Sequence, residues 1–343
     1  MKRGFFIIIL VFQMLLAANL LGQSVRDITK VGTTAAPFLE IEVGSRAIAM
    51  GGAYVAAARD ASALYWNPSG IARMSQGEAF LSHTKWLADT QYDFVGLVLP
   101  AGQVGTLGFM FSTLNMGEMK VRTILYPEGT GELFDANSFM FGATWARNLT
   151  DRFSIGLSAK WIHETIWHMH SSALAIDIGT LFTTPFNGLM LGMSISNFGN
   201  KLQLMGKDTQ IKYDPDPTHY GNNSKIDAFM HTSAWSLPLI FRVGLAYPLL
   251  KSGSNSLILA MDAAHPNNNT EYVNVGMEYG FRNNLYLRFG YKSLFLKDSE
   301  EGLTAGAGFS YRMIGNIRVH MDYAYADFGI LNSVQRFSLG ILF

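Results

Sequence analysis

Cysteine is absent from this sequence of 343 residues. Its absence excludes disulfide bridges, thiolate metal sites and a lipid-modified N-terminal cysteine. Charge is also scarce, because charged residues make up 15% of the chain, against about a quarter of a typical soluble domain. The 26 basic and 26 acidic residues balance, so nothing supports a nucleic-acid partner, which would need a basic face. A surface this poor in charge suits a protein whose outside meets lipid.

Beyond residue 22 the sequence has no apolar run long enough for a transmembrane helix, which needs about 20 residues. At the start of the chain, Lys2 and Arg3 precede an apolar run over 5–16, and small and polar residues follow it. This pattern predicts a signal peptide over 1–22, cleaved after Gly22, rather than an uncleaved anchor. Only helices and closed barrels satisfy every backbone group in lipid, so a mature chain that spans a membrane must be a barrel.

From about residue 77 onward, the dominant period of the sequence is two. In the last segment, for example, Phe337, Leu339 and Ile341 alternate with Ser338 and Gly340, as in a strand with one apolar and one polar face. Most of these segments have the 9–12 residues that a tilted strand needs to cross a bilayer. They number fourteen: 77–86, 91–99, 104–114, 137–147, 152–162, 171–182, 188–197, 237–248, 255–264, 270–280, 284–293, 302–312, 316–326 and 335–343.

The connections between these segments favour a transmembrane barrel over a soluble sandwich. Links after even-numbered segments are tight, whereas those after odd-numbered segments are longer on the whole, and 115–136 and 198–236 are very long. The link 87–90 is a short exception. Outer-membrane barrels have short periplasmic turns and long outer loops. We therefore predict an all-β, antiparallel barrel of about 14 strands over 77–343 in the bacterial outer membrane, with both chain ends on the periplasmic side.

Residues 23–76 lack the period of two and are rich in alanine and glycine. A short, interrupted helix is expected over 46–58, weakened at Gly51 and Gly52 by about 1 kcal/mol each relative to alanine. The run from Asn67 to Gly70 is a turn signature directly before the first strand. We predict a small N-terminal helical segment that either plugs the lumen or lies in the periplasm.

Two stretches of this segment resemble a known family. Residues 38–53 read FLEIEVGSRAIAMGGA, and residues 60–70 read DASALYWNPSG. Together they resemble the PorV/PorQ family of outer-membrane proteins and, more distantly, the FadL-type transporters of hydrophobic molecules. Ser69 stands where the related Asn-Pro-Ala-Gly segment has alanine. The residues that carry the resemblance are Phe38, Arg46, Met50, Gly51, Gly52, Asp60, Asn67, Pro68 and Gly70.

The resemblance implies a fourteen-stranded barrel with its N-terminal segment at or in the lumen. It also implies a non-enzymatic role as a partner or docking protein in type IX protein secretion and cell-surface attachment. One member of the family binds the C-terminal signal domains of secreted cargo, and another anchors a surface component of the attachment complex. The FadL-type alternative is a transporter, which would need an apolar pocket, for example around Met190 and Leu181.

The sequence offers no pattern that requires a cofactor, a metal or a catalytic group. His163, His168 and His170 lie together, but we expect them at the top of a surface hairpin rather than around a metal ion. No spacing singles out a nucleophile with its base. The lumen-facing sets contain charges of both signs, which could form ion pairs inside the barrel. They are Asp177, Arg242, Glu278, Arg288, Lys292, Arg312, Arg318 and Asp322.

Partners besides the outer-membrane lipid are expected at two places. The long loop 198–236 carries exposed apolar residues, which indicate either a protein interface or a loop folded over the barrel mouth. Its candidate partner residues are Tyr213, Tyr220, Phe229 and Trp235. The final Phe343 lies on the apolar face of the last segment and resembles the signal that the outer-membrane assembly machinery reads. Secretion-system proteins or cargo signal domains are the partners that the resemblance implies.

Overall fold

The computed structural model describes residues 30–343 except 220, 222, 224, 297, 298 and 314. The signal peptide predicted over 1–22 lies outside the described residues. Within the described part, no helix is both long and apolar enough to cross a membrane.

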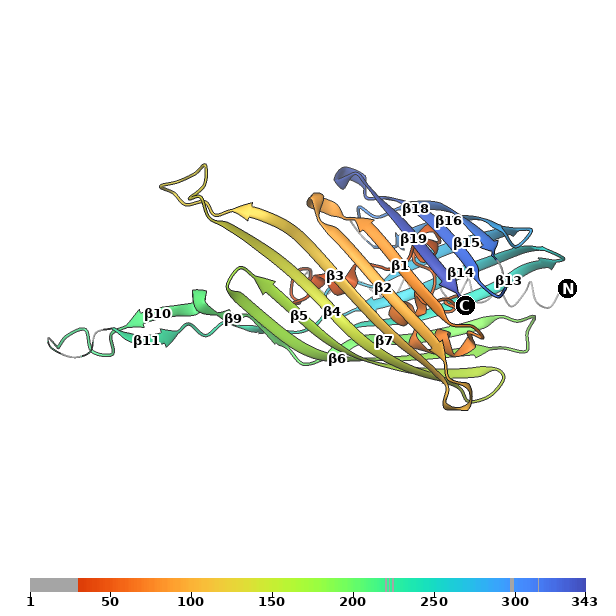
Figure 1. Cartoon of the computed structure of the whole chain (residues 1–343), viewed down its shortest axis with the longest axis horizontal. Coiled ribbons are helices and arrows are strands. Elements are labelled where there is room, and N and C mark those ends of the chain that lie inside the picture. Colours follow the sequence, from red (N-terminus) through yellow and green to blue (C-terminus); the bar gives the residue numbers. More distant parts are fainter. Residues whose placement is uncertain (1–29, 220, 222, 224, 297–298, 314) are drawn as a thin grey trace, which may run out of the picture.

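Fourteen long strands form a closed antiparallel barrel, as predicted (Figure 1). Each of the fourteen predicted segments overlaps one of them. They are β1 (Glu78–Lys85), β2 (Gln91–Pro100), β3 (Thr106–Lys120), β4 (Leu133–Asn148), β5 (Phe153–Ile166), β6 (Met169–Thr183), β7 (Met190–Gly199), β13 (Ile240–Ser252), β14 (Asn255–Pro266), β15 (Tyr272–Phe281), β16 (Leu285–Leu294), β17 (Leu303–Arg312), β18 (Arg318–Asp327) and β19 (Ser333–Leu342).

Neighbours in sequence are neighbours in the barrel, except that β7 pairs with β13 across the long loop. The barrel closes where β1 pairs with β19, from Glu78 opposite Leu342 to Lys85 opposite Gln335. Closure leaves no strand edge facing lipid, as a membrane barrel requires. The wall follows the alternation of the sequence: in β19, for example, Val334, Arg336 and Ser338 are buried while the residues between them point outward.

Strands β3 to β6 extend past their predicted bounds at the long-loop end and project beyond the rest of the wall there (Figure 1). Strand β3 continues to Lys120 and β4 begins at Leu133, so much of the predicted loop 115–136 is strand. Strands β5 and β6 leave only Trp167 and His168 between them. The sequence did not predict these longer strands, because their ends carry polar residues. Outside the membrane, neither face of a hairpin needs to be apolar.

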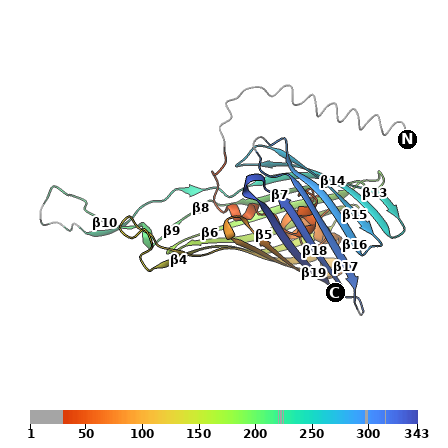
Figure 2. The same cartoon turned by 90° about the horizontal axis from the view of Figure 1, so that it is seen from above.

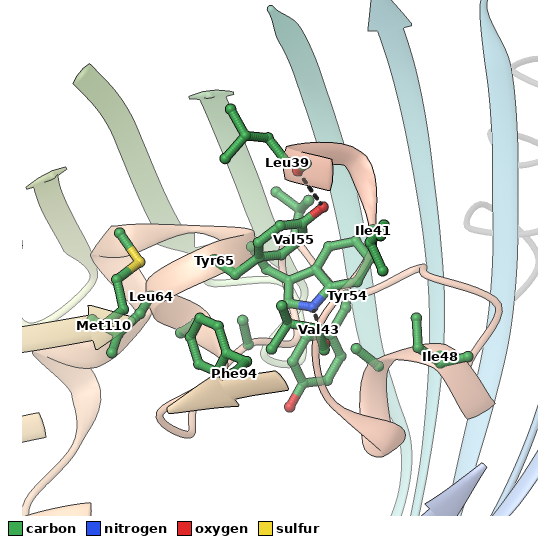
Figure 3. Packing of buried hydrophobic residues seen from close by; sticks show 14 of the residues in the cluster. Leu39, Ile41, Val43, Ile48, Tyr54, Val55, Leu64, Tyr65, Phe94 and Met110 are labelled. Carbon is green, nitrogen blue, oxygen red and sulfur yellow. Dashed lines mark hydrogen bonds between the residues drawn. The ribbon is translucent and has the colours of Figure 1, made fainter. Parts of the chain in front are cut away.

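Residues 37–73 lie inside the barrel and form four short helices (Figures 1 and 2). They are η1 (Pro37–Glu40), α2 (Ser45–Ala49), α3 (Ala63–Trp66) and η2 (Pro68–Arg73). We call residues 37–73 the plug. Its side chains make up about half of the buried apolar core, including the fully buried Trp66. Tyr54 and Ile48 belong to the same core (Figure 3).

Two local expectations for the plug are wrong. The helix expected over 46–58 ends at Ala49, because Gly51 and Gly52 take left-handed backbone angles, with φ of 67° and 74°. The turn expected at Asn67 is instead the start of η2: the Asn67 side chain accepts a hydrogen bond from the Ser69 amide, and Pro68 occupies the first helical position.

The long loop after β7 forms an arm that projects away from the barrel at the long-loop end (Figures 1 and 2). It contains short paired strands that the sequence reading treated as loop. They are β8 (Leu202–Gln203), β9 (Met205–Gly206), β10 (Gln210–Tyr213), β11 (Ile226–Phe229) and β12 (Ala234–Trp235), with η5 (Lys207–Thr209) between β9 and β10. Three further single turns of 3-10 helix are η3 (Leu87–Asp89), η4 (Gly102–Val104) and η6 (Gly329–Leu331).

The first described residues lie at the end of the barrel opposite to the one expected. Thr34 forms a parallel bridge with Ser236 and accepts a hydrogen bond from Asn268, and both partners belong to links at the long-loop end. Phe343, in contrast, exchanges two backbone hydrogen bonds with Gly77 at the short-turn end. The plug therefore runs through the lumen from one mouth to the other.

Candidate functional site: the plug and the arm

Arg46, on α2, joins the plug to the barrel wall. Its Nε and Nη2 atoms donate to the two carboxylate oxygens of Glu278 on β15, each at 2.7 Å. Its Nη1 atom lies 3.2 Å from Asp60 Oδ2. The planar guanidinium fits a carboxylate with two parallel hydrogen bonds, so this contact fixes orientation as well as distance.

The charges continue from Glu278 along the wall. Arg288 donates to Glu278 at 2.6 Å and to Asp322 at 2.6 Å, and the side chains of all three residues are at most 5% exposed. All three were predicted to face the lumen, and the structure brings them together with the motif residue Arg46. A buried charge is tolerated only when it is paired, and each of these buried charges lies beside a group of opposite charge. We call Arg46, Asp60, Glu278, Arg288 and Asp322 the lumen ion network.

Asp60 is the second plug residue in this network. Its carboxylate accepts hydrogen bonds from the Tyr54 hydroxyl at 2.5 Å and from the Ser62 hydroxyl at 2.5 Å. Burial alone would raise the pKa of Asp60, but the positive charge of Arg46 and these hydrogen bonds outweigh it and hold the pKa below its ordinary value. Asp60 is therefore a stable anion within the lumen.

The glycine pair of the motif allows the plug to touch the wall backbone. A Cβ atom on Gly51 would lie 2.7 Å from the amide nitrogen of Tyr291 and 2.7 Å from the carbonyl oxygen of Val275. A Cβ on Gly52 would lie 2.8 Å from the Glu42 carboxylate. Both positions also have positive φ, which favours glycine.

The wall carries matching glycines that the sequence reading missed. At seven strand glycines, a Cβ would lie less than 3.0 Å from an atom of the plug. They are Gly108, Gly156, Gly179, Gly192, Gly276, Gly290 and Gly306. Their signal in the sequence is a glycine at a lumen-facing position of a predicted strand, where a missing side chain marks close approach of another backbone.

Asn67 and Pro68 fasten the middle of the plug. The Asn67 amide nitrogen donates to the carbonyl of Val55 at 2.9 Å and to that of Thr180 on β6 at 3.0 Å. A Cβ on Gly70 would meet the carbonyl of Ala58, so this motif glycine permits a close contact within the plug. Phe38 and Met50, the other motif residues, are buried in the apolar core. The structure therefore brings all nine motif residues into the lumen.

Two further polar contacts hold the plug. Asp262 on β14 accepts hydrogen bonds from the amides of Tyr54 at 2.7 Å and Val55 at 2.8 Å. Lys292 on β16 pairs with Glu42 of the plug at 2.8 Å and with Glu301 at 2.6 Å. Lys292 was predicted to face the lumen, whereas Glu42 and Glu301 lie in segments without periodicity, so their partners could not be foreseen.

The place where an apolar transport pocket was considered is filled. Leu181 is fully buried, and Met190 is 5% exposed with its sulfur 2.6 Å from the Arg59 guanidinium. The plug core is held by its own hydrogen bonds: Tyr65 donates to the carbonyl of Leu39 at 3.2 Å, and the Trp66 indole donates to that of Val43 at 2.8 Å (Figure 3). Among the described residues, no group of three or more His, Asp or Glu side chains is placed to hold a metal ion.

The arm presents exposed apolar side chains. Tyr213, Phe229 and Trp235 are each more than half exposed, while Tyr220 lies outside the described residues. The arm does not fold over the barrel mouth (Figure 2). Pairing in its outer hairpin places Tyr213 opposite Ile226 and Ile211 opposite Ala228. Because side chains alternate along a strand, these four residues share one face, which we call the apolar arm face. Phe229 lies on the opposite face, which it shares with Gln210, Lys212 and Asp227 and which we call the polar face after these three residues.

Phe343 lies at the seam where β1 and β19 close the barrel. Its ring is half exposed and covers Gly77, since a Cβ on Gly77 would lie 2.6 Å from that ring. A larger residue at position 77 would push the ring away from the seam.

Comparison with known proteins supports the resemblance seen in the motif. The model of a family described as "Type IX secretion system protein PorV" matches residues 24–222, which include the whole plug and the first seven strands. No curated protein matches the sequence.

Solved structures of similar fold include a hydrocarbon channel and a toluene transporter. The CymD monoaromatic hydrocarbon channel is 11% identical, with a TM-score of 0.53 over 88% of this chain and 97% of that chain. The Pseudomonas putida toluene transporter TodX is 12% identical, with a TM-score of 0.53 over 88% of this chain and 96% of that chain. At this identity the likeness confirms the FadL-type barrel fold and carries no further information on function.

Proposed function

Because the chain belongs to the PorV family of type IX secretion system proteins of the bacterial outer membrane, we propose that it is a plugged barrel that docks a protein partner in type IX secretion or cell-surface attachment. The partner is a secretion-system protein or the signal domain of a secreted cargo protein. The observation that carries the proposal is the apolar arm face, held away from the barrel at the long-loop end.

The arm has the features of an unoccupied binding surface for a protein partner. An isolated two-stranded hairpin is marginally stable in water, and it gains stability when its apolar face is covered. Ile211, Tyr213 and Ile226 on that face are all more than a third exposed. Strands β10 and β11 form a sheet of their own, so their outer edges are also open to an additional strand. The long-loop end faces outward in outer-membrane barrels, so the partner would meet the arm at the cell surface.

The lumen supports a docking role better than transport. A FadL-like transporter of hydrophobic small molecules is the alternative, favoured by the fold similarity to hydrocarbon channels. Passage would require the plug to leave the wall. That movement would separate Arg46 from Glu278 and Asp262 from the Tyr54 and Val55 amides, leaving buried polar groups unpaired. We therefore propose that the barrel works as a scaffold without catalysis or transport.

We also propose that Phe343 acts before docking, during assembly. Its half-exposed ring at the closing seam is the feature that assembly machinery could read in an unfolded outer-membrane protein. Replacement of Phe343 by alanine should lower the amount of folded barrel in the outer membrane. Replacement of the exposed Phe186, in the turn between β6 and β7, should not.

Co-purification tests the docking role. The intact barrel is isolated from outer membranes in mild detergent as wild type, as an apolar-face variant (Tyr213→Ser with Ile226→Ser) and as a polar-face variant (Lys212→Ser with Asp227→Ser). Lys212 and Asp227 pair on the opposite face of the same hairpin, so the two variants change equal numbers of arm residues. We expect type IX components or cargo signal domains with the wild type and the polar-face variant, and at least tenfold less with the apolar-face variant. Absence of such proteins from the wild-type sample would refute the proposal.

A further inference from the structure

A small polar pocket lies at the short-turn end of the lumen, away from the arm. Its volume is about 180 Å³, and four arginines contribute to its lining: Arg46, Arg59, Arg288 and Arg318. The strand residues of the lining come from the ends of β1, β16, β17, β18 and β19 nearest the short turns. The pocket is therefore reached from the side of the membrane that the short turns face.

The carboxylates of this pocket already have partners. Asp60 and Asp322 are held by Arg46 and Arg288 in the lumen ion network. Glu78 accepts a hydrogen bond from the Ala61 amide at 3.1 Å, and its other oxygen lies 3.3 Å from His320 Nε2. The negative charges in the lining are thus directed at groups of the protein itself.

Two of the arginines have no such partner. Within the described residues, neither Arg59 nor Arg318 forms an ion pair, and both are exposed at the pocket mouth. The Arg59 guanidinium donates to the sulfur of Met190 at 2.6 Å. The mouth of the pocket therefore holds positive charge that the protein does not neutralise.

The pairing of β17 with β18 is independent evidence for unneutralised positive charge at this end of the lumen. Arg312 and Arg318 are directly opposite each other in this pairing, and alternation from the buried Ser310 and Asp322 places both on the lumen side. Like charges directly opposite in adjacent strands are destabilising. An anion between them would remove the repulsion, whereas nothing in the described fold requires two arginines at this position.

We propose that this pocket binds a small oxyanion, a carboxylate or a phosphate, presented from the short-turn side of the membrane. Guanidinium groups bind both anions through pairs of hydrogen bonds, and Arg59 and Arg318 have such donors free. A volume of 180 Å³ admits several times the roughly 30 Å³ of a water molecule, which suits one anionic group rather than a whole lipid or sugar. The inference does not rest on the docking role of the arm.

Phosphate binding by the purified full-length barrel tests the proposal. The thermal unfolding midpoint is measured against inorganic phosphate at constant ionic strength, for the wild type, for Arg59→Gln with Arg318→Gln, and for Arg152→Gln. Arg152 lies in an exposed short turn at the same end of the barrel and outside the pocket, so it controls for general loss of surface charge. We expect saturable stabilisation of the wild type and of Arg152→Gln, and at least tenfold weaker binding by the double variant. Equal phosphate binding by the double variant, or no saturable binding by the wild type, would overturn the proposal.

A competition experiment separates the two sources of the anion. A short peptide with a free C-terminal carboxylate is added to the phosphate-bound barrel, and the same peptide with an amidated C-terminus serves as its control. Competition by the free peptide alone identifies a polypeptide terminus as the ligand. Competition by acetate and phosphomonoesters, with neither peptide effective, identifies a small free anion. Failure of every oxyanion to compete would contradict the proposed chemistry even if the arm binds its partner.

Discussion

At the scale of single residues, the motif before the first strand consists of contacts between plug and wall. Gly51 and Gly52 let backbone meet backbone, and Arg46 and Asp60 carry the charges that the lumen ion network pairs. The sequence showed that these residues form a unit, because glycines and charges stand at fixed spacing in an otherwise apolar segment. It did not show their partners, because Glu278 is more than 200 residues away in the chain.

The close approach at Gly51 can be tested by adding one methyl group. Gly51→Ala forces a left-handed residue, which costs about 1–2 kcal/mol, and drives a Cβ into the wall, which costs about 1–3 kcal/mol more. Gly102→Ala is the matched control, because Gly102 also has positive φ but has no atom near its missing Cβ. Urea unfolding in lipid vesicles should show a clearly larger loss of stability for Gly51→Ala. Equal losses would mean that the plug does not touch the wall there.

The lowered pKa of Asp60 predicts a pH dependence. A carboxyl whose pKa is lower in the folded than in the unfolded state stabilises the fold above its unfolded pKa, and this contribution is lost as the pH falls through the folded pKa. Asp60→Asn should therefore lower the free energy of unfolding at pH 7, and the difference from wild type should shrink below the ordinary value of 3.8. Unfolding at pH 7, 5 and 3 measures this difference. A gap that stays constant over this range would show that the charge of Asp60 is not what stabilises the plug.

At the scale of elements, the barrel strands could be predicted, whereas the internal structure of the plug and the strands of the arm could not. A strand that faces lipid on one side and the lumen on the other has residues that alternate with a period of two. All fourteen barrel strands could therefore be predicted from the sequence. Segment 46–58 has no such pattern, and its shape depends on Gly290 and Gly276 of the wall opposite it. The arm strands were missed because they are two to four residues long and lie outside the membrane.

Hydrogen exchange tests whether the arm needs its partner for stability. Strands β10 and β11 have only each other, so their amides should open with free energies near zero in the isolated protein. The amides of β14 and β15, paired on both sides, should be strongly protected under the same conditions. Addition of the partner should slow exchange in β10 and β11 alone. Strong protection of both strands without a partner would show that the arm is a rigid structure in its own right.

At the scale of the whole molecule, the chain is an outer-membrane barrel whose lumen is occupied along its length. The plug enters beside Ser236 at one mouth and leaves through Gly77 at the other, which gives the wall an internal support. Barrel closure, lipid-facing residues and localisation followed from the sequence. The position of the first described residues did not, because a chain segment inside a lumen can enter from either mouth without changing the strand pattern.

An occupied lumen predicts low permeability. Vesicles that contain the reconstituted barrel should take up small sugars no faster than protein-free vesicles, since the plug and the lumen ion network fill the interior. An open porin in the same lipid provides the positive control. Steady uptake through the wild-type barrel would indicate that the plug leaves the lumen, and would favour the transport alternative.

Photo-crosslinking in living cells tests whether the apolar arm face binds a secretion partner. A photoreactive residue replaces Tyr213 on the apolar arm face or, as control, the neighbouring Lys212 on the polar face. We expect the probe at position 213 to form covalent adducts with a type IX secretion component or a cargo signal domain, and the probe at 212 to form far fewer. Adducts that are absent at 213, or equally abundant at both positions, would contradict a specific docking function of the arm.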